Sequence, residues 1–158
     1  MSSSPGEPRF YRLTLALVAI AFVAIVAYWG VWFFGDRQAL ASLDTPAYYT
    51  FEDSFPAADG WLALACAACA FALWRRRPSA MLWLIVGGSA AIYLGLMDVL
   101  FDVENGVYLA PRGDWGAVGT EIGINAFSLF VGAWVVIYGW VHRAWFLGRA
   151  PGARGPGG

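Results

Sequence analysis

The stretch at residues 13–34, LTLALVAIAFVAIVAYWGVWFF, contains no charged side chain. Its length is close to the roughly 20 residues that an α-helix, rising about 1.5 Å per residue, needs to cross a hydrocarbon core. Three further apolar blocks of similar length follow at residues 57–74, 80–101 and 120–141, each with a single charged residue. Because lipid offers no hydrogen-bond partners to a bare backbone, each block is predicted to be a transmembrane α-helix.

The overall composition agrees with this interpretation. The chain is 59% hydrophobic and only 13% charged, whereas about a quarter of the residues in a soluble domain are charged. We therefore expect an all-α, polytopic integral membrane protein in which residues 9–146 form a four-helix transmembrane bundle. The flanking residues 1–8 and 147–158, rich in Ser, Pro and Gly, are expected to be disordered tails.

Positive and negative side chains are segregated along the chain. Eight of the ten arginines fall in the amino-terminal segment, the turn at residues 75–77 and the carboxyl-terminal tail. Ten of the eleven acidic residues fall in or beside the other two connections. Since short cytoplasmic loops of membrane proteins carry the excess of arginine and lysine, we expect both termini and the 75–77 turn on the cytoplasmic side of the plasma membrane.

The first block also has features of a cleaved signal, because Ala39-Leu40-Ala41 resembles a signal-peptidase site. The apolar core of a secretory signal spans about 7 to 15 residues, and the block at residues 13–34 is longer. We therefore interpret it as an uncleaved anchor. It is apolar all round, so its sequence does not indicate which face packs.

Small and polar residues repeat along one face of each of the other three blocks. Such residues mark the side of a membrane helix that faces protein, since they allow close approach and interhelical hydrogen bonds. Alternating spacings of three and four residues place each set on one face, so these faces are predicted to meet inside the bundle. They are Asp59, Leu62, Cys66, Cys69 and Leu73 on the second block; Gly88, Ala91, Gly95, Asp98 and Asp102 on the third; and Glu121, Asn125, Ser128, Gly132, Val135, Gly139 and His142 on the fourth.

The acidic members of these faces, together with Asn125, gather at the non-cytoplasmic end of the bundle. Ionisable side chains within membrane helices are costly and usually functional. This favours binding or transport of a cation, a proton or a small polar molecule at an outward-facing acidic vestibule. If the ligand is a metal, an all-oxygen ligand set favours calcium, magnesium or manganese, and no particular cofactor is indicated. The candidate binding residues are Asp59, Asp98, Asp102, Glu121 and Asn125, with Glu52, Asp53 and Glu104 as further candidates.

A simpler interpretation is that these acids are solvated residues on the acidic side of the membrane. Arg37 and Arg112 would then pair with some of them. The position of Asp98 is consistent with this alternative, since it lies about 27 Å along its predicted helix from Ala80, near the membrane surface.

The tetrapeptide Cys66-Ala67-Ala68-Cys69 has the CxxC spacing of thiol redox motifs. The motif and the helix number are similar to those of quinone-linked thiol oxidases of the disulfide-bond formation protein B type, which would imply a membrane thiol/quinone oxidoreductase. Those enzymes need a reactive pair near the outer surface and a second cysteine pair, whereas this chain has two cysteines, both in an alanine-rich run. Apolar surroundings make a thiol behave as a small hydrophobe, so this hypothesis is the least favoured.

The sequence disfavours several other functional classes. No catalytic triad, phosphate-binding loop, dinucleotide fingerprint or zinc motif can be assembled. The chain has no lysine, and most of its arginines lie at the predicted membrane face, which leaves nucleic-acid binding without support. The remaining alternative is an accessory or scaffolding subunit, since the polar face of the fourth block would also suit a partner in a larger membrane complex or a homo-oligomer.

Overall fold

The computed structural model describes residues 6–109 and 115–148. Within these ranges every regular element is helical, and four helical runs are long and apolar enough to cross a membrane, which confirms the predicted all-helical architecture. Most of the two expected tails, and Arg112, lie outside the described residues. The elements are α1 (Tyr11–Phe34), the 3₁₀ helix η1 (Arg37–Ala39), α2 (Pro46–Glu52), α3 (Pro56–Trp74), α4 (Ala80–Glu104), α5 (Trp115–Val141) and α6 (Arg143–Leu147).

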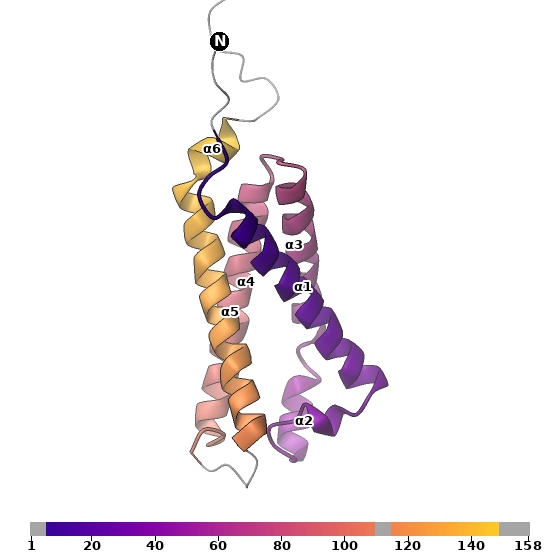
Figure 1. The fold of residues 1–158 in the computed structure, drawn as a ribbon. Coiled ribbons are helices and arrows are strands. Elements are labelled where there is room, and N and C mark those ends of the chain that lie inside the picture. The colour runs from indigo at the N-terminus through magenta and orange to yellow at the C-terminus, as the bar shows by residue number, and fades with distance from the viewer. Residues whose placement is uncertain (1–5, 110–114, 149–158) are drawn as a thin grey trace, which may run out of the picture.

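The bundle has two chemically different ends. The arginine-rich end contains the start of α1, the turn between α3 and α4, and α6, whereas the acidic end contains α2 and the adjoining ends of α4 and α5 (Figure 1). Helix α1 crosses the bundle obliquely: it lies beside α5 near the arginine-rich end and moves away from it toward the acidic end (Figure 1). It packs along α3 and touches α5 only sparsely.

The most extensive contact between helices in the described part of the chain joins α4 and α5. A Cβ added at Gly88 would lie 2.7 Å from the carbonyl oxygen of Gly132, and a Cβ added at Gly95 would lie 3.2 Å from the side chain of Leu129. The hydroxyl of Ser128 donates a hydrogen bond of 3.0 Å to the backbone oxygen of Ala91. Small residues therefore let the two backbones approach, as the spacing of these faces predicts.

Helices α3 and α4 form an antiparallel hairpin. At the end of α3, Arg76 adopts a left-handed conformation with φ of 53°, and the amide of Arg77 donates to the carbonyl oxygen of Ala72. This bond is the 6→1 contact of a Schellman motif, which terminates a helix by satisfying its last carbonyl groups. The Arg76 guanidinium pairs with Glu7, which ties the amino-terminal segment to the turn.

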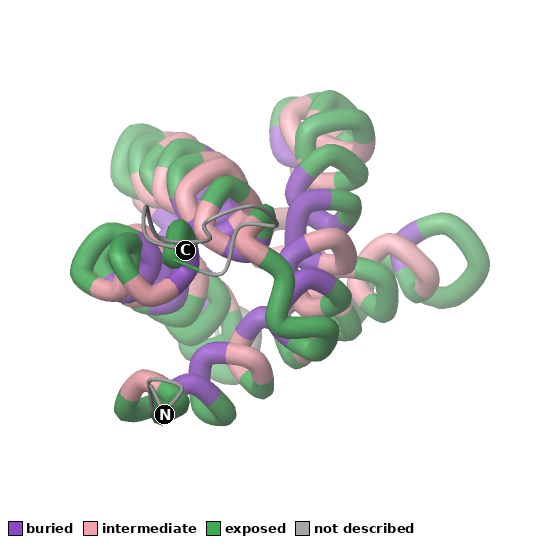
Figure 2. The backbone as a smooth tube through the Cα atoms, turned by 90° about the horizontal axis from the view of Figure 1, so that it is seen from above, coloured by how far each residue is buried: buried purple, intermediate pink, exposed green. Residues whose placement is uncertain are grey.

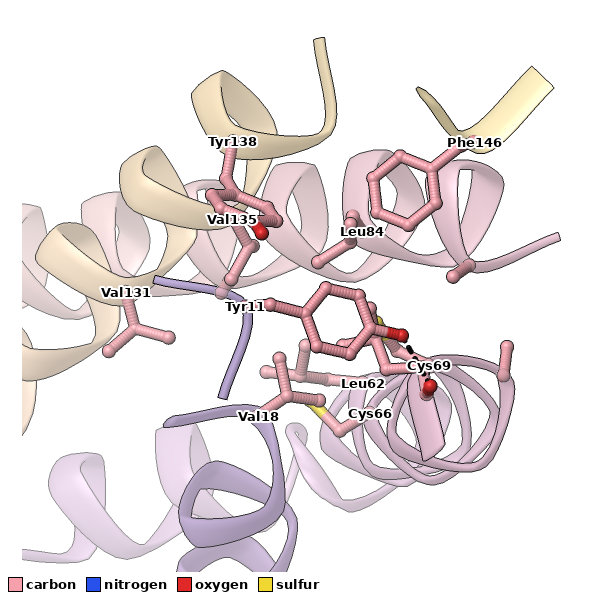
Figure 3. Packing of buried hydrophobic residues seen from close by; sticks show 14 of the residues in the cluster. Tyr11, Val18, Leu62, Cys66, Cys69, Leu84, Val131, Val135, Tyr138 and Phe146 are labelled. Carbon is pink, nitrogen blue, oxygen red and sulfur yellow. Dashed lines mark hydrogen bonds between the residues drawn. The ribbon is translucent and has the colours of Figure 1, made fainter. Parts of the chain in front are cut away.

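The hydrophobic core fills the arginine-rich half of the bundle. Tyr11 enters this core from α1 and donates a hydrogen bond to the backbone oxygen of Leu73, while Tyr138 and Phe146 pack from α5 and α6 (Figure 3). The indole of Trp134 donates to the hydroxyl of Thr14 at 3.1 Å, which joins α5 to α1 at this level. Viewed along the bundle, buried positions face one another and exposed positions form the outside (Figure 2).

One face of α1 points into the bundle, although the uniformly apolar sequence of this helix does not indicate which face it is. This face combines core residues near the arginine-rich end with aromatic residues near the acidic end, and its members recur at spacings of three and four. They are Tyr11, Thr14, Val18, Ala21, Ile25, Tyr28 and Trp32.

Candidate functional site

A cavity of about 500 Å³ lies in the acidic half of the bundle, where α1 and α5 diverge. Four of its lining residues are acidic and come from different elements: α2, α3, α4 and α5. The remaining walls are mainly apolar. The lining residues are Ile20, Ala21, Ala24, Ile25, Tyr28, Glu52, Phe55, Asp59, Leu62, Leu94, Asp98, Thr120, Glu121, Gly123, Ile124, Phe127 and Ser128.

Two of the carboxylates are held by aromatic donors from α1. The hydroxyl of Tyr28 donates to Glu52 Oε2 at 2.8 Å, and the indole of Trp29 donates to Asp59 Oδ2 at 2.9 Å. Tyr28 and Trp29 lie one after the other in the last turns of α1, so this helix end orients both acids. Each of these bonds engages one oxygen of its carboxylate.

The other two carboxylates are less constrained. The hydroxyl of Ser42, in the connection between η1 and α2, donates to Glu121 Oε2. Asp98 has no hydrogen-bond partner among residues 6–109 and 115–148, although it is only partly exposed. Its carboxylate therefore faces the cavity without a hydrogen-bond donor from the described part of the protein.

The four carboxyl groups of the cavity have no basic partner among the described residues. Asp98 lies within electrostatic range of Glu52, Asp59, Asp102 and Glu121. Within the part of the chain that the structure describes, the ion pairs involve only Glu7 with Arg12 and Arg76, at the opposite end. Carboxylates that share a cavity repel one another when they are ionised. A bound cation or bound protons would relieve this repulsion.

Asp102 and Asn125 lie beside the cavity and do not line it. The Asn125 amide donates to Asp102 Oδ2 at 2.9 Å, and the hydroxyl of Tyr108 donates to the same oxygen at 2.7 Å. Both residues of the pair are buried, with exposed fractions of 2% and 3%. Burial, followed by the hydrogen bond to Asp102, raises the pKa of Tyr108 to about 12. This network fastens the segment after α4 onto the α4–α5 interface.

The remaining candidate acids lie outside the cavity. Asp53 is exposed and accepts a hydrogen bond of 3.0 Å from the indole of Trp32, and Glu104 is exposed at the end of α4. The guanidinium of Arg37 lies over the ring of Tyr49 at 4.8 Å and forms no described ion pair. The expectation that Arg112 pairs with an acid falls outside the described residues.

The cavity does not have the geometry of a metal centre. Among the described residues, no group of three or more His, Cys, Asp or Glu side chains is arranged so that it could hold a metal ion. The four carboxylates instead surround a space large enough for a small organic molecule, since ligand pockets commonly measure about 300 to 1,000 Å³.

The two cysteines lie within the apolar core and do not line the acidic cavity. Cys66 and Cys69 are free thiols with exposed fractions of 7% and 2% (Figure 3). They adjoin a void of about 20 Å³ whose other lining residues are all apolar. A void of that size has no room for a quinone ring beside the thiols.

Several residues of the site were not among the sequence-based candidates. Tyr28 and Trp29 had no detectable signal, because α1 is apolar all round and its sequence does not indicate which face points inward. Ser42 and Tyr108 also had none, since residues in connections have no periodicity from which a contact with a distant helix could be inferred.

The fold and the cavity define an all-helical protein with four helices able to span a membrane and an acidic pocket at one end of them. No known protein family, curated protein or solved structure matches the chain.

Proposed function

We propose that this chain is a multi-pass membrane protein of the plasma membrane that binds a small organic cation in the acidic cavity. The four apolar helical runs support insertion in a bilayer. The segregation of arginine to one end supports an orientation with that end and both termini in the cytoplasm. In this orientation the cavity faces the outer half of the membrane.

The observation that carries the proposal is the set of four carboxylates around one cavity with only neutral donors attached to them. Tyr28, Trp29 and Ser42 supply these donors, and none of them cancels charge. A positively charged ligand would therefore find acceptors already oriented, and Asp98 would gain its missing partner. The volume of about 500 Å³ suits an organic cation better than a bare metal ion.

The cavity extends through only half of the bundle. Its lining ends near Ile20 and Ser128, and the packed core of Val18, Val131 and Tyr138 begins beyond them. A ligand in the cavity is therefore separated from the cytoplasmic end by packed side chains. This arrangement supports binding at the outer side, and transport would require the core to open.

A thermal-stability titration of the purified protein in neutral detergent tests the proposal, with tetraethylammonium chloride as the probe and sodium chloride at equal ionic strength as the reference. A ligand that binds only the folded state stabilises it by about 2.7 kcal/mol at 100 times its Kd. We expect tetraethylammonium to raise Tm of the wild type, and Asp98→Asn or Glu121→Gln to abolish the effect.

Glu104→Gln is the matched control, because Glu104 is an exposed acid at the same end of the bundle and does not line the cavity. It should retain the full response. The same Tm shift in Asp98→Asn as in the wild type, or no response in the wild type, would refute the proposed site.

A role as an accessory subunit remains the second candidate, and the separation of α1 from α5 favours it. Only 11% of the residues in the most apolar stretch of α1 are buried inside the protein. A helix of a partner or of a second copy would therefore find apolar surface there. Purification in mild detergent distinguishes the two functions: a monodisperse monomer without companions contradicts the accessory role.

A further inference from the structure

The cavity is divided into a polar and an apolar half along the bundle axis. Its four carboxylates lie toward the acidic end, whereas Leu94 and Phe127 continue the walls toward the middle of the bundle. Leu94 lies one helical turn, about 6 Å, below Asp98 on α4, and Phe127 lies about 9 Å below Glu121 on α5. The apolar half is thus deep enough for a hydrocarbon group attached to a charged head.

The apolar half is also open at the side of the bundle. Ile20 of α1 and Ile124 of α5 both line the cavity, yet they remain 55% and 43% exposed. Ala24 on α1 and Gly123 on α5 are likewise exposed lining residues. These residues belong to α1 and α5, the two helices that diverge toward the acidic end (Figure 1). In the proposed membrane orientation this opening faces the hydrocarbon of the outer leaflet.

The polar half selects for a cation without an accompanying anionic group. A phospholipid with an amine headgroup would bring its phosphate next to Glu52, Asp98 and Glu121. The described residues place no arginine within ion-pair distance of these acids, so the phosphate would be repelled and left unpaired. A single-chain ammonium compound avoids this cost.

From these observations we propose that the ligand is an amphiphilic organic cation that enters from the outer leaflet between α1 and α5, with its ammonium group among the carboxylates and its hydrocarbon chain along Leu94, Ile124 and Phe127. This inference rests on the proposed function and specifies the ligand class and the route of entry for the same cavity.

Binding of three probes to the purified full-length protein in neutral detergent, below the critical micelle concentration of each probe, tests the inference by calorimetry. Octyltrimethylammonium has both a head and a tail, tetramethylammonium has the head alone, and octylphosphocholine adds a phosphate to the same head and tail. We expect octyltrimethylammonium to bind at least tenfold more tightly than either of the other two compounds.

A substitution in the apolar wall tests the route of the chain. Ala24→Phe places a ring in the opening, because a helical side chain leans toward the amino terminus and thus toward Ile20. It should weaken octyltrimethylammonium binding at least tenfold and leave tetramethylammonium binding unchanged. Ala27→Phe is the matched control, since Ala27 is exposed on the same helix and does not line the cavity.

The outcomes separate this inference from the proposed function. If tetramethylammonium and octyltrimethylammonium bind equally well, and both lose affinity in Asp98→Asn, the cation site stands and the amphiphilic ligand is refuted. Equal binding of octylphosphocholine would mean that a phospholipid headgroup occupies the site. If Asp98→Asn leaves the binding of all three compounds unchanged, both proposals fail.

Discussion

The carbonyl oxygen of Gly88 lies 2.9 Å from the position that a Cβ on Gly132 would occupy. Helices α4 and α5 therefore meet backbone to backbone at this level, about one third of the length of each helix from the arginine-rich end. The contact holds together the two helices that carry Asp98 and Glu121. The geometry of the cavity thus depends on glycines that do not line it.

Substitution of Gly132 by alanine should destabilise the protein. The added methyl group would meet the Gly88 carbonyl oxygen and, at 2.9 Å, the Ile92 side chain, so the helices must move apart. Overpacking of this kind costs about 1–3 kcal/mol, which thermal unfolding in detergent would measure as a lowered Tm. Gly30→Ala is the control, because nothing lies within 4 Å of a Cβ there. Equal stability of the two variants would contradict the close approach.

Alkaline conditions should weaken the network that Tyr108 forms with Asp102 and Asn125. The pKa of Tyr108 is raised to about 12 in the folded protein, against about 10 for an unperturbed tyrosine. A raised pKa means that the folded state retains a proton that the unfolded state releases, so stability falls as pH rises from about 10 to about 12. Solvent screening keeps the loss well below the roughly 3 kcal/mol that a shift of this size would give for a fully buried group.

Thermal unfolding of the wild type and of Tyr108→Phe across this pH range measures the effect. The variant lacks the titrating hydroxyl, so its Tm should be lower than that of the wild type at pH 8 and should fall less steeply above pH 10. Parallel pH profiles for the two proteins would show that Tyr108 does not carry the dependence.

Chemical labelling should place the two ends of the bundle on opposite sides of a membrane. In a background with Cys66→Ala and Cys69→Ala, single cysteines would replace Thr50 in α2 and Ser79 in the α3–α4 turn, both of which are exposed. A membrane-impermeant maleimide applied to intact spheroplasts should label position 50, and position 79 only after permeabilisation.

The opposite labelling pattern would reverse the orientation that the arginine distribution predicts. Labelling of both positions without permeabilisation would contradict a bundle that crosses the bilayer. The background without cysteines, which should remain unlabelled, is the control for specificity.

The sequence alone determined the helical architecture and the faces on which α3, α4 and α5 pack. Hydrophobic length is a local property, and the spacing of Gly88, Gly95, Ser128 and Gly132 marks a contact face because small residues contrast with the bulky apolar residues around them. Helix α1 has no such contrast. Its inward face therefore became identifiable only when Tyr28 and Trp29 were seen to contact acids on other elements.

The tertiary structure decided which acids line the cavity and which form buried hydrogen bonds beside it. Asp98 and Asp102 lie one turn apart on α4 and look equivalent in the sequence, but Asp102 is hydrogen-bonded by Asn125 and Tyr108 while Asp98 faces the cavity. Which acid finds a donor depends on how far α1 diverges from α5 and on where the connecting segments lie. The periodicity of a single helix contains neither quantity, because both arise from packing between residues that are distant along the chain.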